Sequence, residues 1–407
     1  MVTQGKMPPA DRVGENLLQR SGLPTFFEIG NLDEIGLALP ENRHGQSVRV
    51  WARSLTVMQK EAIVASVGSG AVWRLASDEG PYLDGFDAAP CPLAFLSTGM
   101  VASYMNEVLA LADQRGLTFG DLVLVQDNFY TMEGSALRGT MVGGALPVEL
   151  DVRIDTDAED GPLNDLVSAA VHASPVDGLM RGRHTSLFTL TMNGKEAPVG
   201  RVASIGHPAE PDPGDQFPRV RPAAGRAGEE ITRLEAVKSV AGVAGGAGSS
   251  LHAQQSRKLH LRVICRRRPD GVKEVEQHLY SPLGSTFRFL SDETAECGGT
   301  GAAPDAVSYL AAGIAFCFMT QHGRYAKIMK KDLSHYRVIQ DIHFSLGGAS
   351  GGTGGVGVAD DVETHVYLDT SAGEDFARRC LDMAEQTCFL HAFCRTPLEP
   401  TITITRM

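Results

Sequence analysis

Hydrophobic and polar residues alternate over many short stretches of this chain, and a few longer apolar stretches interrupt them. Alternation with a period of two is typical of half-buried strands, whereas a long apolar run that begins at proline is typical of a buried helix. In the first half the pattern predicts strands at 47–57, 61–67, 71–77, 121–131, 147–155 and 185–192, with helices at 90–116 and 162–174. In the second half it predicts strands at 258–266, 273–280, 285–290, 335–346, 363–369 and 401–406, with helices at 304–323 and 373–390.

The order of these elements repeats, and the two copies overlay at one offset of 214 residues. A single offset that aligns two separate helices without a gap indicates an internal duplication, although two unrelated domains with similar helices remain an alternative. The aligned pairs include Pro90 with Pro304, Gly99 with Gly313, Ser103 with Cys317 and Ser174 with Cys388.

The segment between the copies is rich in proline, glycine and charged residues, as linkers often are. We therefore expect an α+β protein with four parts. These are an N-terminal arm at 1–45, a first domain at 46–206, a linker at 207–230 and a second domain at 231–407.

The composition narrows the possible function. Hydrophobic residues make up 43% and charged residues 21% of the chain, which excludes wholesale disorder. The net charge of −12 argues against a nucleic-acid or anionic-membrane partner. The longest apolar run, 309–319, is too short to span a membrane, and the N-terminal sequence has no signal-peptide core. Seven cysteines without a Cys-x-x-Cys pair fit a reducing compartment, so we expect a cytoplasmic protein.

Two cysteines of the second half are the candidates for chemistry. Cys317 lies deep in the apolar helix predicted at 304–323, just after several small residues that permit close approach of another element. Cys388 lies near the end of the helix predicted at 373–390. The aligned positions of the first half, Ser103 and Ser174, lack a thiol, so that half should be inert in thiol chemistry.

At these residues the chain resembles the OsmC/Ohr family of thiol-dependent peroxide reductases. The resemblance is carried by the proline-started helix with the run Leu310-Ala-Ala-Gly-Ile-Ala-Phe-Cys317-Phe, by the helix ending in Glu-Gln-Thr-Cys388, and by the order of the strands. The first half resembles a degenerate copy, with Ser174-Pro-Val where the family usually has Cys-Pro-Val. The resemblance implies two tandem OsmC-like domains, each a curved, mainly antiparallel sheet wrapped on a long central helix. Together they would form an intrachain pseudo-dimer, with a further homodimer left open.

The family resemblance also implies a mechanism. The first cysteine of the family attacks the peroxide oxygen and becomes a sulfenic acid, the second condenses with it to a disulfide, and an external dithiol restores both. Carried over, Cys317 is the attacking residue and Cys388 the resolving one, the substrate is a small hydrophobic molecule such as an organic hydroperoxide, and no bound cofactor is required.

A cation is expected beside Cys317, because this residue lies too far from its helix N-terminus for the helix dipole to lower its pKa by much. The family uses an arginine held by an acidic residue just after the helix-starting proline. Asp305 matches the acid and Arg268 resembles the arginine. The alternatives for the arginine are Arg266, Arg267, Arg53 and Arg74.

Departures from the family pattern keep other functions open. Phe389 replaces the usual proline, and His391 is unusual at its position. In a second hypothesis the protein is a cofactor-free hydrolase in which Cys317 attacks an activated carbonyl and His391 or His322 acts as base. In a third the protein only binds a ligand and its cysteines are packed in the core.

Two further motifs resemble binding sites, but each has a simpler structural explanation. Cys388, His391 and Cys394 have a spacing that could supply zinc ligands together with Cys317, but one apolar helix face has the same spacing. The glycines of 352–357 match G-x-G-x-x-G, yet a strand rather than a helix is predicted to follow them, which favours a hairpin loop over a dinucleotide site.

Overall fold

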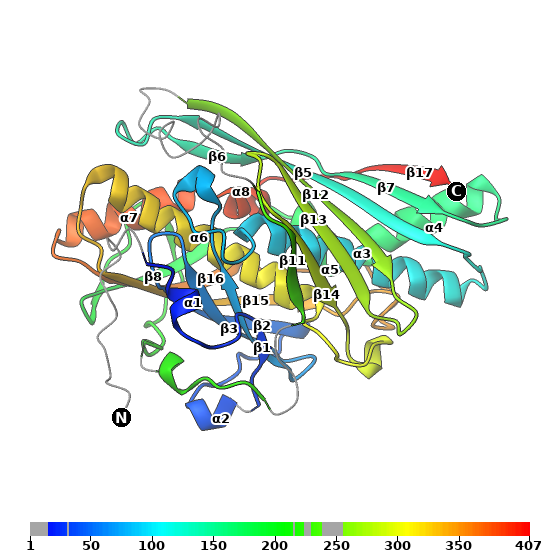
Figure 1. Cartoon of the computed structure of the whole chain (residues 1–407), viewed down its shortest axis with the longest axis horizontal. Helices are drawn as coiled ribbons and strands as arrows, with labels where there is room; N and C mark the ends of the chain where they lie inside the picture. The colour runs from blue at the N-terminus through cyan, green and yellow to red at the C-terminus, as the bar shows by residue number, and fades with distance from the viewer. Residues whose placement is uncertain (1–14, 31, 215, 224–228, 238–254) are drawn as a thin grey trace.

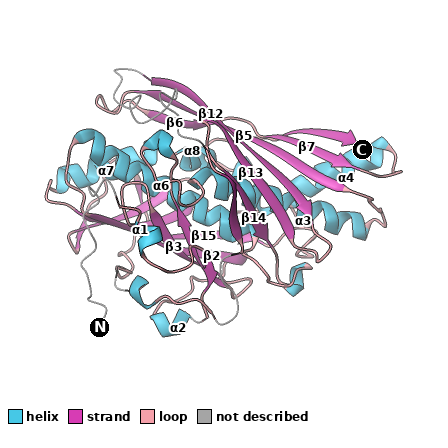
Figure 2. Ribbon diagram, in the orientation of Figure 1, coloured by secondary structure: helices cyan, strands magenta, loops and turns pink. Residues whose placement is uncertain are grey.

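Two long helices and two mainly antiparallel sheets make up the computed structural model, which describes residues 15–30, 32–214, 216–223, 229–237 and 255–407. The predicted α+β class is therefore confirmed (Figure 2). No helix within these ranges is long and apolar enough to cross a membrane.

The elements of the first half follow an arm that contains α1 (Leu17–Arg20), β1 (Phe27–Glu28) and α2 (Leu32–Ile35). They are β2 (Gly45–Ser54), β3 (Lys60–Ser66), β4 (Val72–Ser77), α3 (Pro92–Gln114), β5 (Leu122–Gly134), β6 (Val142–Ala145), β7 (Glu149–Ile154), α4 (Asp160–Ala173), α5 (Pro175–Arg181) and β8 (Ser186–Met192). The short strands β9 (Lys195–Ala197) and β10 (Ala203–Ser204) end this half.

The second half has β11 (Ile231–Glu235), β12 (Gln255–Arg267), β13 (Lys273–Ser281), β14 (Thr286–Ser291), α6 (Ala306–Met329), β15 (His335–Ser345), β16 (Val362–Asp369), α7 (Glu374–Thr387), α8 (Phe389–Arg395) and β17 (Thr401–Arg406). Its helices and β14 coincide with those of the first half at the offset of 214, to within one residue at each end. For β3 and β13 the offset between equivalent residues is one residue smaller, 213 instead of 214. Lys60 pairs with Ser77 and Lys273 pairs with Ser291, so the two lysines occupy equivalent positions.

Each sheet contains strands of both halves, rather than one half building one sheet. The first sheet has the order β1-β4-β3-β2-β15-β16-β8-β10, and the second has the order β11-β14-β13-β12-β5-β7-β17. The two halves meet along the antiparallel pairs β2–β15 and β12–β5. The pattern of alternation specifies strands but not their partners, so the sequence could not reveal this exchange.

Helices α3 and α6 pack against each other between the two sheets, α3 toward the second sheet and α6 toward the first (Figure 1). Their crossing depends on two glycines. A Cβ on Gly313 would lie 2.7 Å from the backbone nitrogen of Leu96, and a Cβ on Gly99 would lie 2.9 Å from that of Leu310. The small residues predicted to permit close approach therefore lie at a helix–helix contact.

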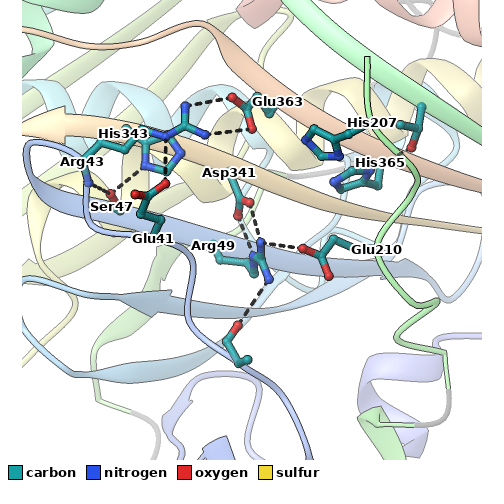
Figure 3. A network of polar contacts seen from close by, with 12 residues as sticks. Glu41, Arg43, Ser47, Arg49, His207, Glu210, Asp341, His343, Glu363 and His365 are labelled. Carbon is teal, nitrogen blue, oxygen red and sulfur yellow. Dashed lines mark hydrogen bonds and ion pairs between the residues drawn. The ribbon is translucent and has the colours of Figure 1, made fainter. Parts of the chain in front are cut away.

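The arm and the linker cover the outer face of the first sheet. Phe27 of β1 and Phe217 of the linker belong to one apolar cluster with Trp51 of the sheet. Beside this cluster lies a polar network, shown in Figure 3, in which Arg49 donates two hydrogen bonds of 2.7 Å to Asp341. Arg49 also contacts Glu210 of the linker at 3.3 Å. The described part of the arm is thus folded against the sheet rather than loose.

Two helix boundaries differ from those predicted. The helix expected at 304–323 continues to Met329, and the helix expected at 373–390 breaks at Cys388 into α7 and α8. Cys388 has an extended backbone (φ −73°, ψ 121°), which interrupts the helix there. The glycines of 352–357 lie in the loop between β15 and β16, outside any helix.

Candidate active site

Cys317 lies in the middle of α6, with its side chain almost fully buried. Its thiol interacts with the side chain of Cys388, which belongs to the same half. Burial, reinforced by this interaction, raises the pKa of the Cys317 thiol well above its usual value. The resting residue is therefore a thiol, and any nucleophilic chemistry requires a group that accepts its proton.

Cys388 is positioned by the break between α7 and α8. It is the N-cap of α8, and its Sγ accepts a hydrogen bond of 3.4 Å from the backbone nitrogen of His391. The cap therefore fixes the sulfur next to Cys317. All seven cysteines of the chain are free thiols in this structure.

A narrow pocket leads to Cys317, and Phe389, the first residue of α8, is part of its wall. Its empty volume, part of which is open to solvent, is about 390 Å³. The apolar part of its wall consists of Leu83, Leu93, Leu259, Leu279, Pro282 and Phe389. Thr320, Gln321 and Arg324 line it one and two turns after Cys317 on α6. The pocket therefore combines a largely apolar wall with polar side chains that follow the thiol on α6.

The first half contributes the charged groups closest to this thiol. Lys60 of β3 is fully buried and donates a hydrogen bond of 2.6 Å from Nζ to Oγ1 of Thr320. Burial lowers the pKa of Lys60, while the charges of Glu79, Asp78 and Cys317 favour its protonated form. Burial thus favours the neutral forms of both groups, so transfer of the Cys317 proton to Lys60 costs more than it would between groups with ordinary pKa values.

Glu79 follows β4 and is also buried in the pocket wall. Its Oε2 accepts a hydrogen bond of 2.7 Å from the hydroxyl of Tyr82. The negative charge of Glu79 stabilises the protonated Lys60 and the guanidinium of Arg324, whose pKa is lowered by burial. Glu79 and Arg324 thus line the pocket together with Cys317, and the amine of Lys60 contacts Thr320 of its wall.

The structure does not bring the other predicted site residues to Cys317. Asp305 is the N-cap of α6 and accepts a hydrogen bond from the Ser308 nitrogen, roughly 18 Å before Cys317 along the helix axis. Arg268 lies in the turn between β12 and β13 and pairs with Asp270 at 3.0 Å. The family pattern places an arginine and an acid at the thiol, but the strand exchange supplies Lys60 and Glu79 from the other half instead.

The alternative arginines of the first half, Arg53 and Arg74, both bind Glu61. Their guanidinium groups lie over Phe217 and Phe27, two residues that cover the outer face of the first sheet. Because α6 packs on the inner face, neither arginine reaches the pocket.

His391 and His322 are buried beside Phe318 rather than exposed to the pocket. Burial lowers the pKa of His391 to about 3 and that of His322 to about 4. Neither ring nitrogen of His391 has a hydrogen-bond partner. Both groups are therefore neutral, weak bases. Within the described ranges, no three histidine, cysteine or acidic residues are arranged to hold a metal ion.

The equivalent position in the first half preserves the geometry without the thiols. Ser103 Oγ and Ser174 Oγ are 2.8 Å apart, and a smaller pocket beside them contains Glu107 and Glu293. The correspondence predicted between the serine pair and the cysteine pair thus extends to their mutual contact.

Sequence reasoning missed Lys60, Glu79, Thr320 and Arg324. The last two had a detectable signal, because they stand three and seven residues after Cys317 and so share its face of the helix. The sequence contains no signal that links Lys60 or Glu79 to Cys317, since their proximity depends on the strand exchange.

Comparison with known proteins bears on the second half. No curated protein matches the chain. Among solved structures, an OsmC-like hydroperoxide resistance protein from Jannaschia sp. CCS1 is 20% identical, covers 31% of this chain and 79% of its own, and has a TM-score of 0.18. The family model of OsmC-like proteins matches residues 299–403. The second half of the chain therefore contains an OsmC-like domain over residues 299–403.

Proposed function

We propose that the protein reduces organic hydroperoxides, with Cys317 as the attacking thiol and Cys388 as the resolving one. The observation that carries the proposal is the interacting pair Cys317–Cys388, with Cys317 in the wall of a largely apolar pocket and the buried amine of Lys60 bonded to Thr320 of the same wall. An apolar wall favours a substrate with a hydrocarbon substituent over hydrogen peroxide.

The chemistry begins with transfer of the Cys317 proton to Lys60, which leaves an ammonium beside a thiolate. The thiolate sulfur attacks the terminal peroxide oxygen, the O–O bond breaks, and the alkoxide takes a proton and leaves as an alcohol. Cys317 is now a sulfenic acid. Cys388 then attacks its sulfur, the S–O bond breaks and water leaves, and an external dithiol reduces the resulting disulfide.

A hydrolase is less well supported, because its base would be a histidine. His391 is neutral with a pKa of about 3, and its ring nitrogens contact no hydrogen-bonding group. Such a group is a weak base at neutral pH. Cys317 therefore has Lys60, not a histidine, as the better proton acceptor.

Peptide mapping after one equivalent of cumene hydroperoxide, without reductant, tests the proposal. We expect a Cys317–Cys388 disulfide in the wild type and loss of hydroperoxide consumption in Cys317→Ser. Hydrogen peroxide should react more slowly than cumene hydroperoxide. If both thiols stay free with cumene hydroperoxide, the protein is not a peroxidase. In that case activity on ester substrates that depends on Cys317 would indicate a hydrolase.

A further inference from the structure

A third cysteine lines the pocket of Cys317. Cys91, the N-cap of α3, belongs to the first half and stands at the pocket wall. It is the most exposed of the three cysteines, with 8% of its surface accessible, against 2% for Cys317 and 0% for Cys388. Cys388 does not line the pocket, whereas Cys91 and Cys317 both do. Cys317 therefore interacts with one fully buried thiol and shares the pocket wall with another.

The helix crossing brings the start of α3 to the same turn of α6. Gly313 stands one turn before Cys317, and a Cβ there would lie 3.1 Å from the carbonyl oxygen of Pro92, the residue after Cys91. The buried amine of Lys60 interacts electrostatically with both Cys91 and Cys317. Both sulfurs therefore belong to the wall of one pocket and interact with the same amine.

We propose that Cys91 is a second resolving thiol for Cys317, so that the pocket can form either of two disulfides. The proposal rests on the proposed function, because it begins from the sulfenic acid of Cys317. The Cys91 sulfur attacks the Cys317 sulfur, an S–S bond forms and the S–O bond breaks. The hydroxide leaves as water with the Cys91 proton. The electrons come from the two thiols, and a dithiol reductant later restores both.

The two disulfides differ in access. A reductant can reach a Cys91–Cys317 bond through the pocket, whereas Cys388 is fully buried and does not line the pocket. Attack on a disulfide requires an approach along the S–S axis, so exposure of one sulfur sets the rate of reduction. The first half therefore contributes a redox group as well as the charges of the pocket.

The test uses the full chain and the variants Cys388→Ser, Cys91→Ser and Cys388→Ser/Cys91→Ser. Serine is a favoured N-cap, so Cys91→Ser should fold. Cys297→Ser, which removes a cysteine of the smaller pocket, is the matched control. Each protein receives one equivalent of cumene hydroperoxide, is trapped with an alkylating reagent and is mapped by mass spectrometry.

In Cys388→Ser we expect a Cys91–Cys317 disulfide, and in the double variant no disulfide and accumulation of the sulfenic acid at Cys317. Cys297→Ser should match the wild type. The proposal is overturned if Cys388→Ser carries Cys317 to the sulfenic or sulfinic acid while Cys91 stays a free thiol. If the wild type is not oxidised at Cys317 at all, the proposed peroxidase function has failed instead, and this outcome is distinct because it precedes any disulfide.

Discussion

At the scale of single residues, the reactivity of Cys317 depends on where its proton goes. Lys60 is the nearest candidate because it is buried, bonded to Thr320 and electrostatically coupled to the thiol. Neither the thiol of Cys317 nor the amine of Lys60 would make the site reactive without the other. A thiol whose pKa is raised by burial is inert at neutral pH, and a lysine whose pKa is lowered is available as a base.

Replacing Lys60 by methionine should therefore slow the reaction of Cys317. We expect the alkylation rate of Cys317 by iodoacetamide at pH 7 to fall by at least about tenfold, the effect of one pKa unit on the thiolate population. Mass spectrometry measures the rate at this site, and circular dichroism verifies the fold. Lys327→Met, which alters an exposed lysine paired with Asp84, is the control. Equal rates in Lys60→Met and wild type would show that Lys60 does not accept the proton.

The buried histidines make a prediction about acid stability. His391 has a folded-state pKa of about 3, below the ordinary value near 6.5. As the pH falls below 6.5, the unfolded chain binds a proton at this position and the folded protein does not, so stability decreases. The loss continues until the pH approaches 3. Its slope is about 1.4 kcal/mol per pH unit for one histidine.

His391→Phe should therefore flatten the acid side of the stability profile. Urea unfolding at pH 6 and pH 4 should show a decrease in the free energy of unfolding that is smaller by about 2–3 kcal/mol than in wild type. The measurement compares the two proteins with each other, because Asp78 also titrates in this range. Its folded-state pKa is about 6, so its protonation raises the free energy of unfolding of both proteins as the pH falls. An exposed-histidine variant, His44→Gln, serves as control. The same slope in His391→Phe and wild type would contradict the prediction.

At the scale of elements, the crossing of α3 and α6 depends on backbone contact at Gly99 and Gly313. A Cβ on Gly99 would meet the carbonyl oxygen of Ala306, and backbone cannot move aside as a side chain can. We expect Gly99→Ala to lower the free energy of unfolding by roughly 1–3 kcal/mol, the usual cost of overpacking. Gly161→Ala in α4, where a Cβ meets no atom within 4 Å, should be neutral or slightly stabilising. Urea denaturation of both variants measures this, and equal stabilities would refute it.

The seam between β2 and β15 depends on one buried ion pair. Arg49 and Asp341 lie opposite each other across the seam, and both are mostly buried. Asp341→Asn leaves a buried guanidinium with only Glu210 nearby, which should cost about 3 kcal/mol of stability. Asp160→Asn, which breaks an exposed pair with Arg406, should cost less than about 1 kcal/mol. If the two variants have the same urea midpoint, the seam does not depend on the buried pair.

Individual elements could be predicted from the sequence far better than their partners. The position of α6 followed from its proline and its apolar run, and the contact of Ser103 with Ser174 matched the alignment of these residues with Cys317 and Cys388. The break at Cys388 was missed because phenylalanine, not proline, follows it. The strand exchange was invisible, because alternation encodes which face of a strand is buried but not which strand lies beside it. For that reason Arg268, rather than Lys60, was expected at the thiol.

At the scale of the whole molecule, the two halves share both sheets but differ in their pockets. Glu293 of the smaller pocket corresponds to Glu79, and Lys273 of β13 corresponds to Lys60. Serines replace the two reactive cysteines, and Ala110 stands at the position of Arg324. Asp305 takes the place of Cys91. One chain therefore offers one pocket with the Cys317–Cys388 pair, and the other half completes it.

Introducing two thiols into the first half tests whether their close contact alone makes them reactive toward hydroperoxide. In the double variant Ser103→Cys/Ser174→Cys the introduced thiols should form a disulfide with diamide, because the serine oxygens they replace are 2.8 Å apart. With cumene hydroperoxide this site should react at least about tenfold more slowly than Cys317, since the pocket has no equivalent of Arg324 and has the additional carboxylate of Glu107, and negative charge disfavours a thiolate. Peptide mapping after each oxidant measures both sites in the same molecule, so Cys317 and Cys388 are an internal control. If the two sites react equally fast with hydroperoxide, Lys273 and the introduced thiols are enough for reactivity. The two halves would then differ in reactivity only because the first half has serines at these two positions.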